Sequence, residues 1–305
     1  MVELKGVIPA ITTPFGEDGS LDIDGFRKLV DLVIGDGVHG VVPNGCTGES
    51  WALTDDERAE VFKATVEVTA GRVPVVPGCG AMSSADAIHK VHQAEVAGCD
   101  AVMIQPPWYV MPSLDEIFEY YKKIIAATEL PIMAYNIPRR TGICFTADFV
   151  DRLADEPRII ALKESSKDWL LLSDIIRRCK DRITILAGYA PLLGLAAITE
   201  GALGFVDSAA PVVGRLAIDF YDAAIAGDIK KARSMQAELA KINRGMFGIG
   251  TFPAANKAAL DMLGRPGGWT RDPIKSLNDE QRVQVRQVLI TAGLLPAEDA
   301  LRATA

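Results

Sequence analysis

The amino-acid sequence predicts a (β/α)8 TIM barrel followed by a C-terminal helical extension. Eight short apolar, β-branched runs recur along the chain up to about residue 206, and amphipathic helical segments fill the gaps between them. This alternation is the pattern of repeated βα units in a closed parallel sheet. The competing fold is an open, doubly wound sheet, but no GxGxxG turn follows the first run to favour it.

The eight predicted strands are continuous apolar runs rather than alternating ones. Such runs are typical of parallel strands that are buried on both faces. The runs are Val7–Ile11, Val38–Val42, Val73–Val76, Ala101–Ile104, Ile132–Tyr135, Ile159–Leu162, Ile183–Leu186 and Ala202–Val206.

Several helix starts can be predicted from the residues between these runs. Thr54-Asp55-Asp56-Glu57 and Ser113-Leu114-Asp115-Glu116 have the capping-box pattern, in which the first side chain and the acid satisfy opposite backbone amides. Asp22 and Thr146 each precede apolar residues at helical spacing, so we expect them to be N-caps. Glycine tolerates the left-handed turn that follows a helix. The predicted helix ends are Gly71 and Gly98.

The strand signal stops after about Gly227, and the rest of the chain is predicted to be helical. The predicted helices are Ile229–Asn243, Ala254–Leu263 and Asp279–Leu295, joined by turns rich in glycine and proline. We therefore divide the chain into a barrel over residues 1–226 and a helical extension over residues 227–305 that packs on the barrel.

Charge and composition exclude several classes of partner. The net charge is −8, whereas nucleic acids and anionic membranes are bound by clustered Lys and Arg. No run approaches the ~18–20 apolar residues that cross a bilayer, and the first residues do not have the pattern of a signal peptide. The five cysteines are scattered and form no CxxC pair. We expect a cytoplasmic protein whose partners are small molecules rather than nucleic acid or membrane.

A metal or cofactor is not expected. The chain has three histidines, His39, His89 and His92, and no cluster of carboxylates or cysteines accompanies them. A catalytic metal site needs several N, S or O ligands that converge on one point. The sequence therefore predicts chemistry carried by side chains alone.

Lys163 is the strongest candidate for a catalytic residue. It follows the apolar run Ile159–Leu162 and precedes the polar Ser165-Ser166, so it is expected at the carboxyl end of the sixth strand. Active sites of barrels lie at these strand ends. Burial disfavours the charged form of a lysine and lowers its pKa, which makes the amine a nucleophile for Schiff-base formation. The alternative is an ordinary lysine at a strand end with its ammonium in water.

The second run ends in a turn, Gly45-Cys46-Thr47-Gly48, that is suited to binding an anion. Glycines on both sides let the backbone turn sharply and present its N–H groups, and the Thr47 hydroxyl can add a donor. A substrate carboxylate is the expected ligand. An ordinary tight turn is the alternative.

Two more strand ends carry polar or aromatic side chains. Tyr135 ends the fifth run, beside the strand of Lys163, where its phenol can relay protons. Arg139 and Arg140 follow in what we expect to be a loop over the pocket, and a guanidinium suits a carboxylate. The loop after the fourth run contains Trp108 and Tyr109, which can line a pocket or a subunit interface.

Together these motifs resemble those of the dihydrodipicolinate synthase / N-acetylneuraminate lyase family of class I, Schiff-base aldolases and lyases. The resemblance covers nearly the whole chain. It rests on Gly6–Pro14, Gly45–Ser50, Tyr135–Gly142, Leu162–Ser165 and Ala187-Gly188.

The resemblance implies a role for each matching residue. Lys163 corresponds to the lysine that forms an imine with pyruvate or another 2-oxo acid, and Tyr135 to the tyrosine that moves protons. The turn around Thr47 corresponds to the binding site of the keto-acid carboxylate. Arg140 corresponds to the arginine that holds the acid group of the aldehyde in the synthases, and Tyr109 to a tyrosine that reaches across a dimer interface. The expected assembly is a homotetramer built from dimers.

The expected active site is therefore a set of nine residues. The catalytic ones are Lys163, Tyr135 and Tyr109, and the substrate-binding ones are Cys46, Thr47, Gly48, Arg140, Gly188 and Val206.

The sequence departs from the family pattern at residues that are expected to bind the second substrate, the aldehyde. Cys46 stands where synthases have a threonine whose hydroxyl links two tyrosines, and a thiol is a weak hydrogen-bonding group. After the seventh run the chain has Gly188-Tyr189-Ala190-Pro191, without the acidic residues that grip a sugar in the lyases. Trp51, Trp108 and Tyr189 add bulk near the expected rim, either to receive a less polar aldehyde or to pack an interface.

Several functions remain open at this point. The leading prediction is a lyase that resembles dihydrodipicolinate synthase and condenses pyruvate with an aldehyde or releases one. The alternatives in the same chemistry are an aldolase or dehydratase of 2-keto-3-deoxy sugar acids and a hydratase-aldolase for a less polar aldehyde. A non-catalytic barrel that binds small acids and a metal-dependent aldolase are the alternatives outside it.

Overall fold

The strands of this protein form the wall of a closed parallel barrel. The structure, a computed structural model, describes residues 2–296. The hydrogen-bonded strands follow the order β1-β6-β5-β4-β3-β2, and every neighbouring pair is parallel. The strands are β1 (Gly6–Val7), β2 (Val102–Ile104), β3 (Ile132–Asn136), β4 (Ile159–Glu164), β5 (Thr184–Ala187) and β6 (Gly204–Phe205).

The gap between β1 and β2 is closed by single bridges rather than by continuous strands. Residues 10 and 42, 41 and 75, and 78 and 103 form these parallel bridges. The predicted strands 38–42 and 73–76 thus lie in the barrel wall but do not form regular ladders, which corrects the sequence prediction. Proline has no N–H to donate to a ladder. The prolines in this part of the wall are Pro9, Pro43, Pro74 and Pro77.

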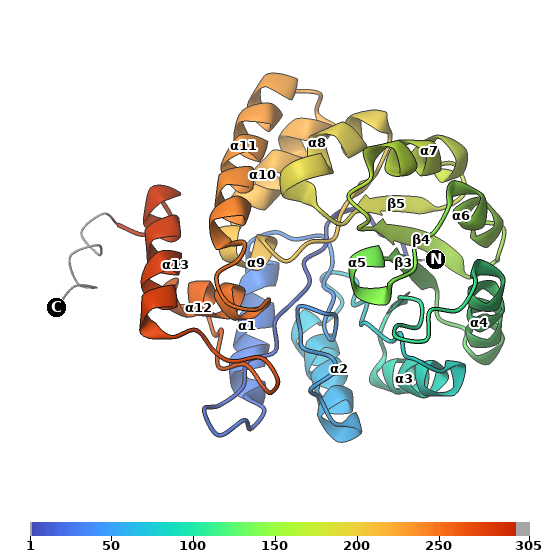
Figure 1. Ribbon diagram of the computed structural model, residues 1–305, viewed down its shortest axis with the longest axis horizontal. Helices are drawn as coiled ribbons and strands as arrows, with labels where there is room; N and C mark the ends of the chain where they lie inside the picture. Colours follow the sequence, from blue (N-terminus) through green and yellow to red (C-terminus); the bar gives the residue numbers. More distant parts are fainter. Residues whose placement is uncertain (1, 297–305) are drawn as a thin grey trace.

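With these bridges all eight predicted segments lie in one closed wall, so the predicted (β/α)8 class is confirmed. The helices α1, α2, α3, α4, α6, α7, α8 and α10 surround the strands in Figure 1. The helices are α1 (Ile23–Gly35), α2 (Asp55–Thr69), α3 (Ser84–Ala97), α4 (Leu114–Ala127), α5 (Pro138–Thr141), α6 (Ala147–Leu153), α7 (Trp169–Cys179), α8 (Ala190–Glu200), α9 (Ala210–Val213), α10 (Arg215–Ile225), α11 (Ile229–Met246), α12 (Ala254–Met262) and α13 (Asp279–Thr291).

The predicted helix starts are confirmed. Asp22 and Thr146 cap α1 and α6, and complete capping boxes begin α2 and α4. Gly98 takes the left-handed C-cap position of α3, as predicted. At the end of α2 the prediction was off by one residue, because Ala70 takes the left-handed position ahead of Gly71. Sequence signals do not separate two adjacent candidates for such a turn.

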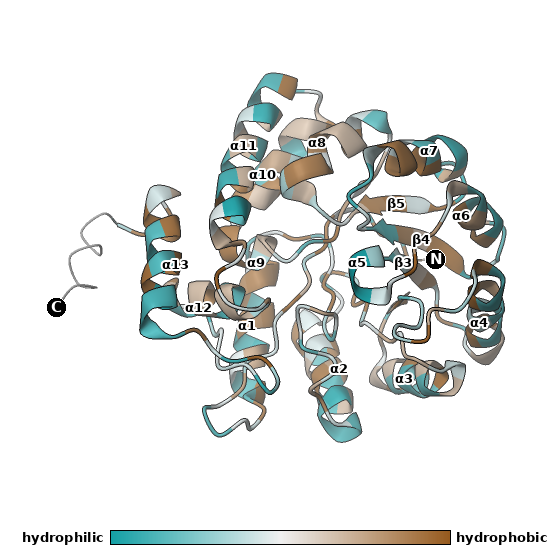
Figure 2. Ribbon diagram, viewed as in Figure 1, coloured by the Kyte–Doolittle hydropathy of each residue, from teal (hydrophilic) through white to brown (hydrophobic). Residues whose placement is uncertain are grey.

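The side chains form two apolar layers, one on each side of the barrel wall. The larger layer lies between strands and helices. The smaller layer fills the barrel and includes Met133, Tyr135 and Ala161. Because successive strand residues point to opposite faces, Lys163 shares the inward face with Ala161. Figure 2 shows the matching pattern, with β4 apolar and the outward sides of the surrounding helices hydrophilic.

The extension packs on one side of the barrel, next to α1, α8 and α10 (Figure 1). Its first helix, α11, is three residues longer than predicted, and α13 ends at Thr291 rather than at residue 295. Ion pairs also tie the extension to the barrel: Arg265 forms two hydrogen bonds with Asp36 at 2.6 and 2.8 Å. The division into two domains at residue 227 stays a prediction.

Over residues 2–296, the structure contains no helix that is both long enough and apolar enough to span a bilayer.

Candidate active site

Lys163 and Tyr135 lie side by side at the carboxyl ends of neighbouring strands. In the parallel ladder of β3 and β4 these two residues are direct partners. The Lys163 Nζ atom lies 4.1 Å from the centre of the Tyr135 ring, over its face. The order of the strands in the sequence predicted this neighbourhood. The adjacent pair Asn136 and Glu164 points the other way and is joined by a 3.0 Å hydrogen bond.

The environment of Lys163 favours the neutral amine. The residue is only 6% exposed, and within residues 2–296 its amine has no ion-pair partner. Burial lowers the pKa of Lys163 to about 8, although the nearby Cys46 and Asp207 act in the opposite direction. A lysine with a pKa in this range is a nucleophile near neutral pH. This state is the one that Schiff-base formation requires.

Tyr135 is equally buried. Removal from water raises the pKa of its phenol well above the usual value, Cys46 adds to this shift, and the charge of Arg140 opposes it. The phenol is therefore protonated at neutral pH. A neutral phenol next to an amine can donate a proton and take it back during carbonyl chemistry.

The turn after the second predicted strand presents backbone N–H groups near Lys163. The Gly48 and Ser50 amides both donate to the Gly45 carbonyl, at 3.1 and 3.3 Å. The amides of Cys46 and Thr47 have no acceptor within residues 2–296. Together with the Thr47 hydroxyl they form a group of donors for an anion.

Gly48 does not line the cavity, although it was predicted to bind substrate. A Cβ atom at this position would lie 3.0 Å from the Ile11 carbonyl and 3.1 Å from the Asn44 amide. The Gly48 carbonyl accepts a 2.8 Å hydrogen bond from the Thr13 hydroxyl. Glycine is therefore needed here for packing behind the turn.

A cavity of about 490 Å³ opens over these groups at the mouth of the barrel. Residues from the strand ends and from the C-terminal extension form its walls. The predicted residues that line it are Cys46, Thr47, Tyr135, Arg140, Lys163, Gly188 and Val206.

Tyr109 lies outside this cavity. Its side chain is 86% exposed, and its backbone has a positive φ of 71°. The loop therefore places the phenol away from Lys163 of the same chain. Trp51 and Trp108 do not line the cavity either, whereas Tyr189 does.

The two arginines after β3 lie on a short helix, α5, rather than in the predicted loop. Pro138 begins this helix and Gly142 ends it with a positive φ of 75°. Both guanidinium groups reach the cavity and stack on aromatic rings of the extension. Arg139 lies over Phe247 and Arg140 over Phe252, at 5.4 and 6.0 Å from the ring centres.

The outer wall of the cavity was not predicted from the sequence. The segment between α11 and α12, with Phe247 and Phe252, covers one side of it, and Lys167 lines it from the loop after β4. The many glycines and prolines of this segment predicted a turn, but they did not predict that the turn lies over the barrel. Nothing in the sequence around Lys167 indicated that this residue lines the cavity.

Asp207 is a half-buried residue of the cavity that was not predicted from the sequence. It follows β6 and accepts hydrogen bonds from the Ala209 and Ala210 amides at 2.8 and 3.1 Å. Burial raises the pKa of its carboxyl, and Lys163 opposes this shift. Asp207 thus contributes a polar group to the cavity besides Tyr135 and Lys163.

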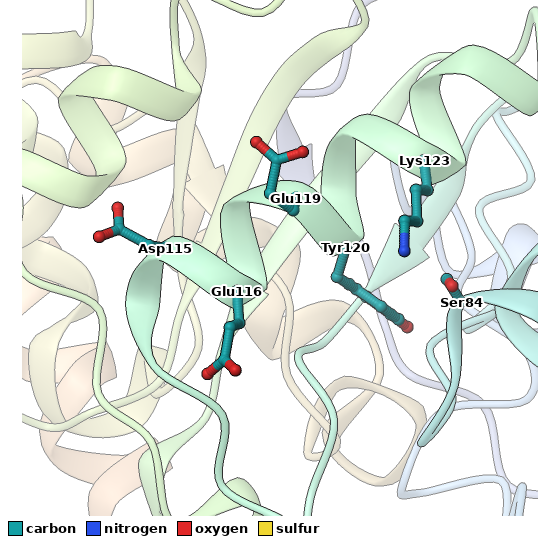
Figure 3. A pocket seen from close by; sticks show the side chains of 6 residues that line it. All are labelled: Ser84, Asp115, Glu116, Glu119, Tyr120 and Lys123. Atoms are coloured by element: carbon teal, nitrogen blue, oxygen red, sulfur yellow. The ribbon is translucent and has the colours of Figure 1, made fainter.

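A second hollow lies on the outer surface between α3 and α4 (Figure 3). Tyr120 and Lys123 extend toward Ser84 there, whereas the acidic side chains of α4 point in other directions. The Tyr120 hydroxyl is already bonded to the Ala81 backbone at 3.1 Å. Because its groups do not converge, this hollow lacks the features of a catalytic site.

Within residues 2–296 no group of three or more His, Cys, Asp or Glu side chains is placed to hold a metal ion.

Comparison with known proteins identifies the family of this chain. Residues 3–292 match the model of the dihydrodipicolinate synthetase family. This chain belongs to that family. The family predicted from the Lys163, Tyr135 and Thr47 motifs is thus confirmed, and so is the prediction of a lyase of the class I aldolase type.

Relatives in the family are similar over almost their whole length. The 4-hydroxy-tetrahydrodipicolinate synthase of Phenylobacterium zucineum (strain HLK1) is 36% identical over 291 residues, which cover 95% of this chain and 98% of the relative. The enzyme of the same name from Methanothrix thermoacetophila is 37% identical, covering 93% of this chain and 96% of the relative.

Solved structures of the family have the same fold. The dihydrodipicolinate synthase of Bacillus anthracis superimposes with a TM-score of 0.91 at 32% identity, covering 97% of this chain and all of that one. The chloride-inhibited enzyme of Acinetobacter baumannii, in complex with pyruvate, has a TM-score of 0.92 at 29% identity, covering 96% and 100%.

Proposed function

We propose that this family member forms a Schiff base between Lys163 and pyruvate, or a closely related 2-oxo acid, and joins the resulting enamine to an aldehyde or releases one. The observation that carries this proposal is the state of Lys163: a buried amine without an ion-pair partner within residues 2–296, with a pKa lowered to about 8, over the ring of Tyr135. The relatives named above are synthases of the same family.

The first step is attack of the neutral Lys163 amine on the keto carbon. The carbonyl oxygen takes a proton, and the carbinolamine then loses water to give a protonated imine. The Tyr135 phenol can supply and recover this proton, because its ring lies against the Lys163 amine and it stays protonated at neutral pH.

The carboxylate of the 2-oxo acid binds at the turn after the second predicted strand. The amides of Cys46 and Thr47, with the Thr47 hydroxyl, supply the donors. An acid held there has its keto carbon directed at the amine, so positioning contributes to the rate as well as to affinity.

The positive imine then withdraws electrons from the neighbouring methyl group. Loss of a methyl proton gives the enamine, and attack of its carbon on an aldehyde forms the new carbon–carbon bond. Hydrolysis of the imine returns the lysine. Arg140 lines the cavity and has no carboxylate partner within residues 2–296. We therefore assign to its guanidinium the binding of an acid group of the aldehyde.

The aldehyde of a dihydrodipicolinate synthase is the first candidate for the second substrate, because the named relatives carry that activity. A less polar aldehyde is the second candidate. Tyr189, Phe247 and Phe252 line the outer cavity, and Cys46 replaces the hydroxyl that the synthases use.

The homotetramer and a cytoplasmic location stay predictions. Tyr109 is exposed and lies outside its own cavity, as expected of a residue that serves a neighbouring subunit. Sedimentation of the wild type and of Tyr109→Ala tests whether this loop lies in an interface.

Reductive trapping tests the proposed function. The protein is incubated with pyruvate and borohydride, digested and analysed by mass spectrometry, and a reduced pyruvyl adduct is expected on Lys163. Lys163→Ala should abolish the adduct, whereas Lys63→Ala, which removes an exposed amine on α2, should leave it unchanged. Wild-type protein without an adduct at Lys163 would rule out the proposal for pyruvate. Activity that persists in EDTA would separate this mechanism from that of a metal-dependent aldolase.

A further inference from the structure

Three cations gather at the mouth of the cavity without a carboxylate partner. Arg139, Arg140 and Lys167 all line the cavity, and none of them forms an ion pair within residues 2–296. Some arginines elsewhere on the surface are paired, such as Arg178 with Asp148 at 2.5 Å and Arg265 with Asp36, whereas others, such as Arg233 and Arg244, have no ion pair within residues 2–296 but do not line a cavity with other cations. Because the protein has a net charge of −8, an unpaired cluster of cations at the cavity stands out.

Lys167 is held in a backbone conformation that side chains rarely adopt. Its φ is 69°, in the left-handed region that favours glycine. The residue follows β4 by three positions, so the strain lies close to Lys163. Strained residues persist where the position of a side chain matters for function.

Aromatic rings orient two of these cations. The Lys167 amine lies 4.4 Å from the centre of the Tyr189 ring and 5.7 Å from that of Phe247. Arg139 stacks on Phe247 at 5.4 Å. A guanidinium on a ring uses its face, which leaves the N–H donors at its edge available for an anion.

These groups form an outer part of the cavity, distinct from its floor. Phe247 is 65% exposed, whereas Lys163 on the floor is 6% exposed. Tyr189 connects the two levels, because it lines the same cavity as Cys46 and Lys163 and its ring lies 4.4 Å from the Lys167 amine. A substrate bound to Lys163 can therefore extend to Lys167 through one continuous space.

We propose that Arg139 and Lys167, on the Phe247 and Tyr189 rings, form a second anion subsite that binds a carboxylate or phosphate at the far end of the aldehyde. This subsite is separate from Arg140 and from the proposed carboxylate-binding site at Thr47. The inference rests on the proposed function, since it describes the second substrate of that reaction. It assigns the aldehyde to the class of terminally anionic compounds with a flat or apolar middle.

The charge of the cavity favours this assignment. Asp207 is the one acidic side chain among the described residues that line it, and the Ala209 and Ala210 amides already bond its carboxylate. Arg139 and Lys167 are exposed at the mouth and have no carboxylate partner within residues 2–296, so a neutral aldehyde would use neither their charge nor their hydrogen-bond donors. An anion gains from both their charge and their donors.

The first experiment compares matched aldehydes with pyruvate as the partner. The pairs are 4-carboxybenzaldehyde and benzaldehyde, succinic semialdehyde and butanal, and glyceraldehyde 3-phosphate and glyceraldehyde, so that the arms separate carboxylate from phosphate. In the wild type the anionic member of at least one pair should have a kcat/KM about tenfold higher or more, as expected for charge-assisted hydrogen bonds.

The variants identify the residues responsible. Lys167→Gly removes the amine and relieves the left-handed strain, so this variant should fold at least as well as the wild type. Arg139→Gln combined with Lys167→Gly should lower kcat/KM for the anionic aldehyde about tenfold toward that of its neutral partner, while Arg140 stays in place. Arg233→Gln, an exposed arginine of α11 that does not line the cavity, should change neither.

A binding measurement does not depend on finding the natural aldehyde. Protein reduced with borohydride in the presence of pyruvate is titrated calorimetrically with terephthalate and with benzoate. Terephthalate should bind more tightly to the wild-type adduct and lose most of this advantage in the double variant, which retains Arg140. Equal affinities in the wild type, or an advantage that is undiminished in the double variant, would overturn the subsite. Failure to form the adduct at all would instead count against the proposed function.

Discussion

Glu49 and Lys257 form a buried ion pair that joins the barrel to the C-terminal extension. Their Oε1 and Nζ atoms are 2.5 Å apart, and the side chains are 0% and 2% exposed. Glu49 ends the turn that carries Cys46 and Thr47, and it has a positive φ of 51°. The Lys257 amine, on α12, also donates to the Trp269 carbonyl at 2.5 Å. The helical extension therefore fixes the turn that forms the proposed carboxylate-binding site.

Removing one partner of this pair should destabilise the whole protein. In Lys257→Met the Glu49 carboxylate stays buried without its cation, and breaking a buried pair in this way typically costs about 3–5 kcal/mol. We expect the free energy of unfolding in urea to fall by this amount, and the affinity for pyruvate to fall with it because the turn loosens.

The double variant Glu49→Gln, Lys257→Met is the control. A neutral amide at position 49 leaves no uncompensated buried charge, so part of the lost stability should return. A double variant less stable than Lys257→Met by the full cost of a second deletion would show that the two residues act independently.

The lowered pKa of Lys163 should appear in the pH dependence of adduct formation with pyruvate. Burial lowers the pKa of Lys163 to about 8, so the neutral fraction rises up to that pH and is nearly constant above it. Below pH 8 each unit should reduce the rate of adduct formation about tenfold. The measurement is the initial rate of adduct formation with pyruvate from about pH 5.5 to about pH 9.5, using a reductant in excess, a range that brackets this pKa.

Asp207→Asn provides a matched variant for this profile. The negative carboxylate acts to raise the pKa of Lys163, and asparagine keeps an oxygen that can accept the Ala209 and Ala210 hydrogen bonds. The profile should therefore move to lower pH. A shift to higher pH, or none, would contradict this account of the electrostatics.

Cys46 should limit the transfer of protons during turnover. The thiol lies near both Lys163 and Tyr135, and it hydrogen-bonds more weakly than a hydroxyl. With pyruvate and aspartate semialdehyde, Cys46→Thr should raise kcat, by up to about 10²-fold if a proton relay is restored. Cys46→Ala, which removes the group, should fall below the wild type. Equal rates for wild type and Cys46→Thr would show that a thiol suffices in the synthase reaction.

Much of the fold followed from local patterns in the sequence. The apolar runs indicated the barrel, and caps such as Asp22 and Thr54 indicated helix starts, because both depend on neighbouring residues. The sequence also predicted regular second and third strands, which the structure does not have. Pro43 and Pro74 remove backbone donors from the ladders there, and the barrel closes through single bridges instead.

The floor of the site was predictable and its outer wall was not. Lys163 and Tyr135 end strands that are neighbours both in the chain and in the sheet. Phe247 approaches the cavity only because the extension folds back over the barrel, and no local signal gives that direction. The geometry of Lys167 depends on a positive φ at a residue that is not glycine, which sequence reasoning does not anticipate.

Glu57 should make the stability of the protein sensitive to acid. Arg271 of the extension binds its carboxylate with two hydrogen bonds, at 2.5 and 2.7 Å, and lowers the pKa of Glu57 to about 2. A carboxyl with a depressed pKa contributes stability that is fully present above its unfolded pKa, here 4.5, and is lost as the pH falls toward 2. Glu57→Gln should therefore be less stable than the wild type at pH 7 by about 1.5–3 kcal/mol, the scale of hydrogen bonds to charged groups.

The difference between Glu57→Gln and the wild type should shrink between pH 4.5 and pH 2, as the carboxyl becomes protonated. Glutamine keeps the capping box that begins α2, so the comparison isolates the ion pair with Arg271. Urea unfolding at a series of pH values measures the difference. Glu60→Gln, an exposed acid on the same helix, should show almost no difference at any pH. A Glu57→Gln difference that stayed constant down to pH 2 would mean that the stabilisation arises from packing rather than from charge.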